Sequence, residues 1–114
     1  MEIQKKNLES KPEVLVLTIS GKISAKELVP FSETLDEVFQ ENRFRIIMDL
    51  TGLEFVNSMG IGKLVVAHKK CTASGGKLVL CGINSKLMKL FSILCLDGIF
   101  PMAEDLNEAE KKVF

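Results

Sequence analysis

The sequence has little of what metal sites and disulfide frameworks are built from. Its 114 residues include a single histidine, His68, and three cysteines without a C-x-x-C pair. Cys71, Cys81 and Cys95 lie ten and fourteen residues apart, whereas a structural zinc site normally takes a full set of Cys or His ligands at short spacings. We therefore expect no metal and no cofactor, and we interpret all three thiols as small buried hydrophobes.

Long hydrophobic runs are also missing. No apolar run reaches the roughly 18 to 20 residues that span a membrane, and the opening residues, MEIQKKNLESKPE, are too polar for a signal peptide. We therefore expect a cytoplasmic protein without a membrane partner. Hydrophobic residues make up 46% of the chain and charged residues 26%, as in an ordinary soluble domain, and the length predicts one domain over residues 1–114.

An excess of charge of either sign is absent as well. The chain has 15 basic and 15 acidic residues, and this balance argues against a nucleic-acid binder. The charges are nevertheless uneven, because residues 55–96 contain no acid and six lysines: Lys63, Lys69, Lys70, Lys77, Lys86 and Lys89. These are interpreted either as solvated side chains on two helices or as a mildly basic face for an acidic or phosphate-bearing partner.

Apolar patterning predicts strands that alternate with helices. Continuous runs rich in Val, Ile and Leu predict buried strands, and shorter runs predict edge strands, together at residues 2–8, 14–19, 44–50, 77–83 and 99–102. Gly21 is expected to end the second strand. Helical spacing predicts helices from Ser24 to about residue 40, from Asn57-Ser58 to Ser74, and over 85–96 and 103–114. The order predicts an α/β domain with a mixed, mostly parallel sheet of about four or five strands packed by about four helices.

The segment DLTGLEFVNSMGIG, residues 49–62, places a polar pair where a parallel strand hands over to a helix. The first turn of a helix presents unpaired N–H groups and about half a positive charge, which favour a phosphate. The alternative is simple capping by Asn57 or Ser58, with Gly60 and Gly62 allowing the helix to pack closely on the sheet. The residues alone leave both interpretations open.

Patterns typical of catalysis are absent. A P-loop would need glycine at Asn57 and Ser or Thr at Leu64, and the dinucleotide pattern G-x-G-x-x-G fails at Val65. His68 is the only available imidazole base, and it falls on the inward stripe of its predicted helix with Thr72, which indicates a packed side chain. We therefore expect no catalytic residue and no enzymatic activity.

The stretch FRIIMDLTGLEFVNSMGIGKLVV resembles the central motif of STAS domains, as found in bacterial anti-sigma-factor antagonists. In that family a buried strand is followed by DL(S/T)x(L/V)xF(I/M)DSxGLGxL. The resemblance continues in LTISGKI, in GGKLVLCGINSKLMKLF and in the ending LCLDGIFPMAEDLNEA, so that it covers almost the whole chain.

The resemblance implies a regulatory switch. Such proteins bind an anti-sigma factor, which is often also a serine kinase, and so release the sigma factor. The kinase phosphorylates the serine that matches Ser58, and the complex dissociates. A PPM-type phosphatase removes the phosphate, so that the complex can form again. The implied partner-binding residues are those at the helix start: Asn57, Ser58, Met59, Gly60, Gly62 and Lys63. A monomer or weak dimer is expected.

This sequence departs from the family pattern at two positions. Asn57 stands where the family most often has Asp, and Met59 stands where Ser or Thr is frequent. The alternatives are therefore a constitutive STAS scaffold or subunit of a signalling or transport assembly that does not cycle through phosphate, and a module that binds a small anionic ligand or nucleotide.

Overall fold

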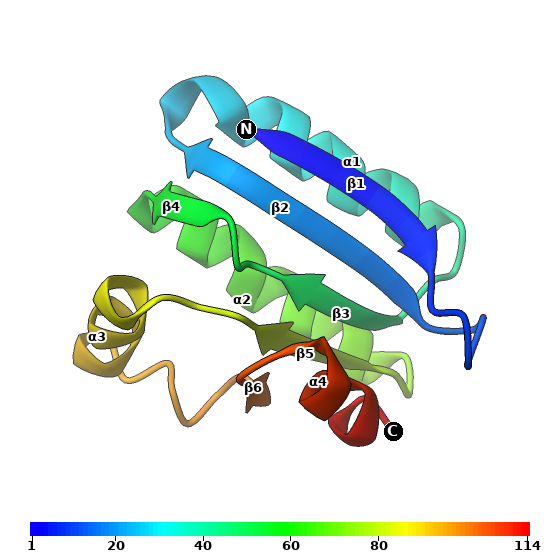
Figure 1. Ribbon diagram of the computed structural model, residues 1–114. Coiled ribbons are helices and arrows are strands. Elements are labelled where there is room, and N and C mark those ends of the chain that lie inside the picture. Colours follow the sequence, from blue (N-terminus) through cyan, green and yellow to red (C-terminus); the bar gives the residue numbers. More distant parts are fainter.

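The computed structural model describes residues 1–114 and contains six strands and four α-helices (Figure 1). The strands are β1 (Glu2–Asn7), β2 (Leu15–Ile23), β3 (Arg45–Asp49), β4 (Leu53–Val56), β5 (Lys77–Cys81) and β6 (Met102–Ala103). A short 3-10 turn, η1 (Ala25–Glu27), leads into α1 (Leu28–Gln40), and the other helices are α2 (Ser58–Ala73), α3 (Ser85–Ile93) and α4 (Leu106–Lys112). The predicted α/β fold is confirmed, with β4 as an additional strand.

Strand β2 organises the sheet because it has two partners on the same edge. Its first half pairs in parallel with β3, and its last residues, Gly21–Ile23, pair in parallel with β4. The main sheet has the order β1-β2-β3-β5-β6, and only β1 is antiparallel to its neighbour. The prediction that Gly21 ends the strand is wrong. Gly21 has a φ of +87° at a register shift, so it redirects the strand without ending it.

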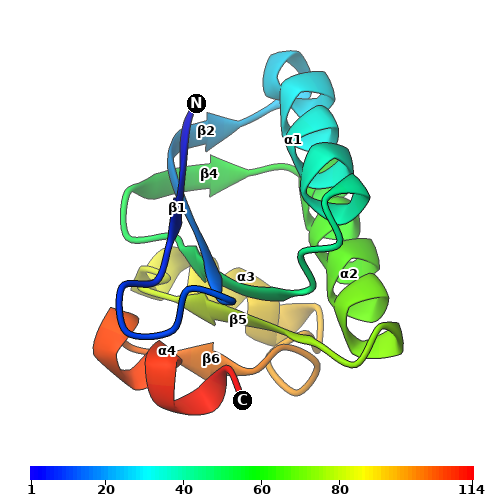
Figure 2. The ribbon, with the colours of Figure 1, turned by 90° about the vertical axis from the view of Figure 1, so that its right-hand side faces the viewer.

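Helices cover both faces of the sheet (Figure 2). Helices α1 and α2 lie on one face, where a cluster of 22 buried residues joins Phe31 of α1 and Leu64 of α2 to the strands. Helix α4 covers the other face, where a smaller cluster joins Ala109 and Val113 to strand residues such as Val79. Burial from both sides explains why the central strands are continuous apolar runs.

The ends of the helices correct several sequence predictions. Helix α3 ends at Ile93, not at residue 96, because Cys95 adopts a φ of +59° and the N–H of Leu96 returns to the carbonyl of Phe91 at 2.8 Å. Cys95 is therefore exposed, and the prediction that all three thiols are buried is correct only for Cys71 and Cys81. Thr72, expected on the inward stripe of its helix, is exposed.

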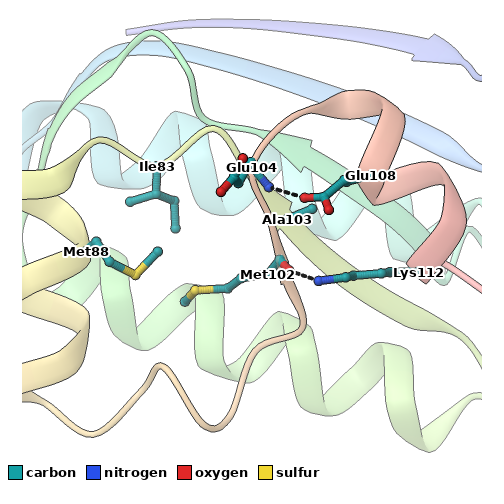
Figure 3. Close-up of a pocket in the computed structure, with 7 residues that line it drawn as sticks. All are labelled: Ile83, Met88, Met102, Ala103, Glu104, Glu108 and Lys112. Carbon is teal, nitrogen blue, oxygen red and sulfur yellow. Dashed lines mark hydrogen bonds between the residues drawn. The ribbon is translucent and has the colours of Figure 1, made fainter.

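Side chains of α4 cover the free edge of β6 (Figure 3). Lys112 Nζ donates to the carbonyl of Met102 at 2.7 Å, and the N–H of Glu104 donates to Glu108 Oε2 at 3.2 Å. These bonds satisfy backbone groups that an edge strand would otherwise expose for pairing. A depression of about 310 Å³ lies beside them, between α3 and α4, and Met88 and Ile83 contribute to its wall.

Candidate partner-binding site at the start of helix α2

Asn57 connects β4 to α2 and is fixed on both sides. Its N–H donates to the carbonyl of Ile23 at 2.9 Å, which continues the pairing of β4 with β2. Its side-chain oxygen accepts from the N–H of Gly60 at 2.8 Å, and its own carbonyl accepts from the N–H of Ile61 at 3.0 Å. Asn57 is therefore the N-cap of α2.

Ser58 is the first residue of α2, and it is exposed. Because Asn57 supplies the cap, the helix does not need the Ser58 hydroxyl for that purpose. The cap also leaves the N–H groups of Ser58 and Met59 without an intrahelical partner, as helix geometry requires. The structure thus separates the two roles that the sequence left open for the Asn-Ser pair: the asparagine caps, and the serine presents a hydroxyl to solvent.

The two glycines of the motif have different surroundings. A Cβ on Gly60 would lie 2.7 Å from Cγ2 of Val56 and 3.1 Å from Cγ2 of Ile23, so only glycine allows this approach of α2 to the strands. A Cβ on Gly62 would meet nothing within 4 Å. The expectation that both glycines serve close packing is therefore correct for Gly60 and wrong for Gly62, which leaves a bare stretch on the outer face of the helix.

A groove between the first turns of α1 and α2 adjoins the motif. This α1–α2 groove encloses about 230 Å³ and is lined by Leu28, Val29, Ser32, Glu33, Met59 and Lys63. The residues Val29 and Met59 are each 64% exposed. The sequence identifies Met59 and Lys63 but not the α1 side of the groove, because no local pattern relates residues thirty positions apart. The available signal is Val29, an apolar residue on the polar side of the first turn of an amphipathic helix.

The six lysines of residues 55–96 do not gather at this site. Lys63 lines the α1–α2 groove, whereas Lys69 and Lys70 lie towards the other end of α2, and Lys70 Nζ is 5.4 Å from the ring centroid of Phe39 on α1. Lys77 begins β5, and two further lysines belong to α3. The six lysines are therefore distributed over α2, β5 and α3, and one of them, Lys63, contributes to the candidate site.

The corner that precedes α1 borders the site and is held by a carboxylate. The hydroxyl and the N–H of Ser24 both donate to Glu27 Oε1. These two hydrogen bonds, the side-chain one foremost, lower the pKa of the Glu27 carboxyl. The bonds fix η1 next to Ile23, whose carbonyl binds Asn57.

His68 lies ten residues beyond Ser58 on α2, which is about 15 Å along a helix. Its ring packs against Phe100 with centroids 5.3 Å apart, and its Nδ1 is buried without a hydrogen-bond partner. The ring is therefore a packing element and not a base beside the serine. No three His, Cys, Asp or Glu side chains of the chain are grouped as metal ligands would be, and no helix is long and apolar enough to cross a bilayer.

The chain is similar in sequence to proteins named as anti-sigma factor antagonists. It is 33% identical over 82 residues to the anti-sigma-B factor antagonist of Listeria monocytogenes, covering 71% of each chain. It is 25% identical over 93 residues to the anti-sigma F factor antagonist of Paenibacillus polymyxa, covering 81% of this chain and 80% of the relative.

Solved structures show the same fold at lower identity. The crystal structure of an anti-sigma factor antagonist from Mycobacterium paratuberculosis matches with a TM-score of 0.86 at 19% identity, over 98% of this chain and 92% of that one. The Bacillus cell fate determinant SpoIIAA in its phosphorylated form matches with a TM-score of 0.74 at 20% identity, over 99% and 100%. The model of the STAS domain family matches residues 5–109. This chain therefore belongs to the STAS domain family.

Proposed function

We propose that this protein is an anti-sigma factor antagonist controlled by phosphorylation. In this proposal it binds an anti-sigma factor that is also a serine kinase, and the bound anti-sigma factor releases its sigma factor. The partner covers the start of α2, at Asn57, Ser58, Met59, Gly60, Gly62 and Lys63. Phosphorylation of Ser58 ends the complex, and a PPM-type phosphatase restores it. The names of the relatives support the role.

One observation carries the switch: Ser58 is exposed at the first position of α2 while Asn57 alone provides the cap. A phosphate on Ser58 adds about 1.5 to 2 negative charges. The helix start tolerates that charge, because its free N–H groups and dipole favour an anion. The cost falls on the complex, since a partner fitted to a neutral hydroxyl would bury a dianion without a matching charge.

The proposal assigns no catalytic residue to this chain, because the kinase and the phosphatase perform the phosphoryl chemistry. It places the protein in the cytoplasm, as a monomer or weak dimer, with protein partners and no nucleic acid. The phosphorylated form of SpoIIAA shares this fold, which supports phosphorylation as compatible with the architecture.

Asn57 favours a second candidate, a constitutive STAS scaffold that never carries phosphate. Its side chain caps the helix as Asp would, but it brings no charge to the kinase. If a carboxylate at this position assists phosphoryl transfer, Asn57→Asp will raise the rate of Ser58 phosphorylation by the kinase while the melting temperature stays nearly constant, because Asn and Asp cap about equally well. A rate that stays equal or falls would show that this protein's kinase has adapted to Asn57, or that no kinase acts here.

Three states of Ser58 test the switch by affinity for the purified anti-sigma factor of the same organism. Ser58→Ala should bind as the unmodified protein does and stay bound in ATP. Phospho-Ser58 should bind more weakly by roughly 2 to 5 kcal/mol, the usual scale for an uncompensated buried charge. Melting curves should show all three folded. Equal affinity of the phosphorylated and unmodified proteins would reject the switch in favour of the scaffold.

A further inference from the structure

The α1–α2 groove has the composition of a contact site for another protein. Its wall is mostly carbon, and the half-buried Leu28 joins it to the main core. Val29 and Met59 come from different helices and line the same groove, and both remain largely exposed. Two large apolar side chains that face solvent across one groove do not contribute to the packing of this chain. Their exposure therefore indicates that another molecule binds in the groove.

The size and charge of the groove restrict that occupant. About 230 Å³ is below the roughly 300 to 1,000 Å³ of pockets that enclose small molecules, but the groove can receive one side chain of a protein. The charged residues of the lining are Glu33 and Lys63. Their opposite charges give no net preference for a charged group, whereas the apolar wall favours an apolar one.

The groove is continuous with the candidate switch. Met59 follows Ser58 directly, and consecutive helix residues point about 100° apart, so Ser58 and the groove flank the first turn of α2. A protein that touches the Ser58 hydroxyl and covers this turn therefore reaches Met59 and, beyond it, Val29. The bare Gly62 leaves the outer face of the helix open to such an approach.

We propose that an apolar side chain of the anti-sigma factor inserts into the α1–α2 groove, with Val29 and Met59 as its principal contacts. This inference rests on the proposed function and adds α1 to the interface. The groove supplies binding affinity that does not depend on phosphate, and the negative charge of phosphorylated Ser58 opposes that affinity. Loss of the groove therefore weakens binding in both states of Ser58, whereas the ratio between the two states stays the same.

Substitutions at Val29 test the groove, with affinity for the purified anti-sigma factor as the measurement. Val29→Ser should weaken binding roughly 10- to 30-fold, as expected for an interface residue whose truncation costs more than about 1 kcal/mol, and Val29→Asp should weaken it further. An acid in the first turn of α1 suits the helix dipole, so the fold should be retained. Met59→Ser should weaken binding as Val29→Ser does, which provides a second variant if Val29→Asp fails to fold.

Ile93→Ser is the matched control, because Ile93 is 77% exposed at the end of α3, outside the groove. It should bind within about threefold of the unmodified protein, as peripheral residues usually do. Equal weakening by Ile93→Ser and Val29→Ser would overturn the groove as the specific anchor. If the Val29 and Met59 variants bind normally while phospho-Ser58 does not, the groove is rejected and the switch stands. If the unmodified protein binds no anti-sigma factor, the proposed function fails and the groove's role fails with it.

Discussion

Helices α2 and α3 are built alike at both ends. Each starts with an asparagine cap followed by an exposed serine, Asn57-Ser58 and Asn84-Ser85, and each cap oxygen accepts a backbone N–H at 2.8 Å. Each is followed, after its C-cap, by a residue of positive φ, Gly75 for α2 and Cys95 for α3. The N–H of the next residue then donates to a carbonyl in the last turn of the helix, at 2.8 Å in both cases. The Asn-Ser start is therefore a capping arrangement that occurs twice in this chain and does not by itself mark a regulatory site.

The surroundings distinguish the two starts. In α2 the cap is followed by the exposed Met59 and by Gly60, which brings the helix close to the strands; in α3 the same positions hold Lys86 and the buried Leu87. Only α2 thus presents its serine beside an apolar side chain that faces solvent. The comparison indicates that the neighbours of a capped serine, more than the cap, make it suitable for recognition by a protein.

A charge placed at each serine in turn tests that difference most strongly. Ser58→Asp should lower the affinity for the anti-sigma factor by about 1 to 3 kcal/mol, less than a phosphate does, because it buries a single charge. Ser85→Asp adds the same charge to an equivalent helix start and should change affinity by less than about 0.5 kcal/mol. Equal losses in a binding titration would mean that net charge, and not the α2 surface, controls the partner.

The two glycines of α2 provide a matched pair for stability. Gly60→Ala should destabilise the protein by about 1 to 3 kcal/mol, because the added methyl group meets Val56 and Ile23. Gly62→Ala should stabilise it by about 0.5 to 1 kcal/mol, since the methyl group meets nothing and alanine is the better helix former. Urea unfolding of both variants measures the difference, and shifts of the same sign would show that the close approach at Gly60 has been misjudged.

The helix ends differ in residue type at the same backbone position. Gly75 has a φ of +79° after α2, and Cys95 has a φ of +59° after α3. Cys95→Gly should therefore stabilise the protein by up to about 1 kcal/mol, and Gly75→Ala should destabilise it by about the same amount, because a side chain strains this conformation. Thermal melts of the two variants are the check; a destabilised Cys95→Gly would indicate that the cysteine side chain makes a contact worth more than the strain.

The last prediction concerns the three thiols, of which Cys71 lies in α2, Cys81 ends β5 and Cys95 follows α3. Burial raises the pKa of the Cys71 thiol from 9.0 to about 12, and burial together with Asp49 and Asp105 does the same for Cys81. At pH 8 a thiol reagent should therefore label the exposed Cys95 once per folded chain, as read by intact mass. Between pH 9 and 12 the folded state should lose stability, because the unfolded thiols ionise first. Rapid labelling of all three at pH 8 would contradict the burial.

Elements that bury both faces or carry a capping residue could be predicted from the sequence. Strands β2, β3 and β5 are continuous apolar runs, and Asn57-Ser58 marks the start of α2 as expected. Strand β4 is not predicted as a separate strand, because it has four residues and buries only the first and the last, Leu53 and Val56, instead of alternating as a half-buried strand does.

Long-range features could not be predicted. The end of α3 was placed too late because Leu94, Cys95 and Leu96 continue the apolar pattern and no glycine marks the turn. The α1–α2 groove depends on how two helices pack against the sheet, and no local pattern reports the distance between Val29 and Met59. The sequence therefore located the serine but not the surface around it.

Strand β4 makes the start of α2 sensitive to α3. One edge of β4 is paired with β2, and on the other side the carbonyl of Leu53 accepts a hydrogen bond from Asn84 Nδ2, 3.2 Å away. Asn84 thus caps α3 with its oxygen and holds β4 with its nitrogen. In amide exchange, β4 should open more readily than β3, which is paired on both edges. Loss of the Asn84 side chain should then speed exchange at β4 and in the first turn of α2, which carries Ser58, while the central strands keep their protection.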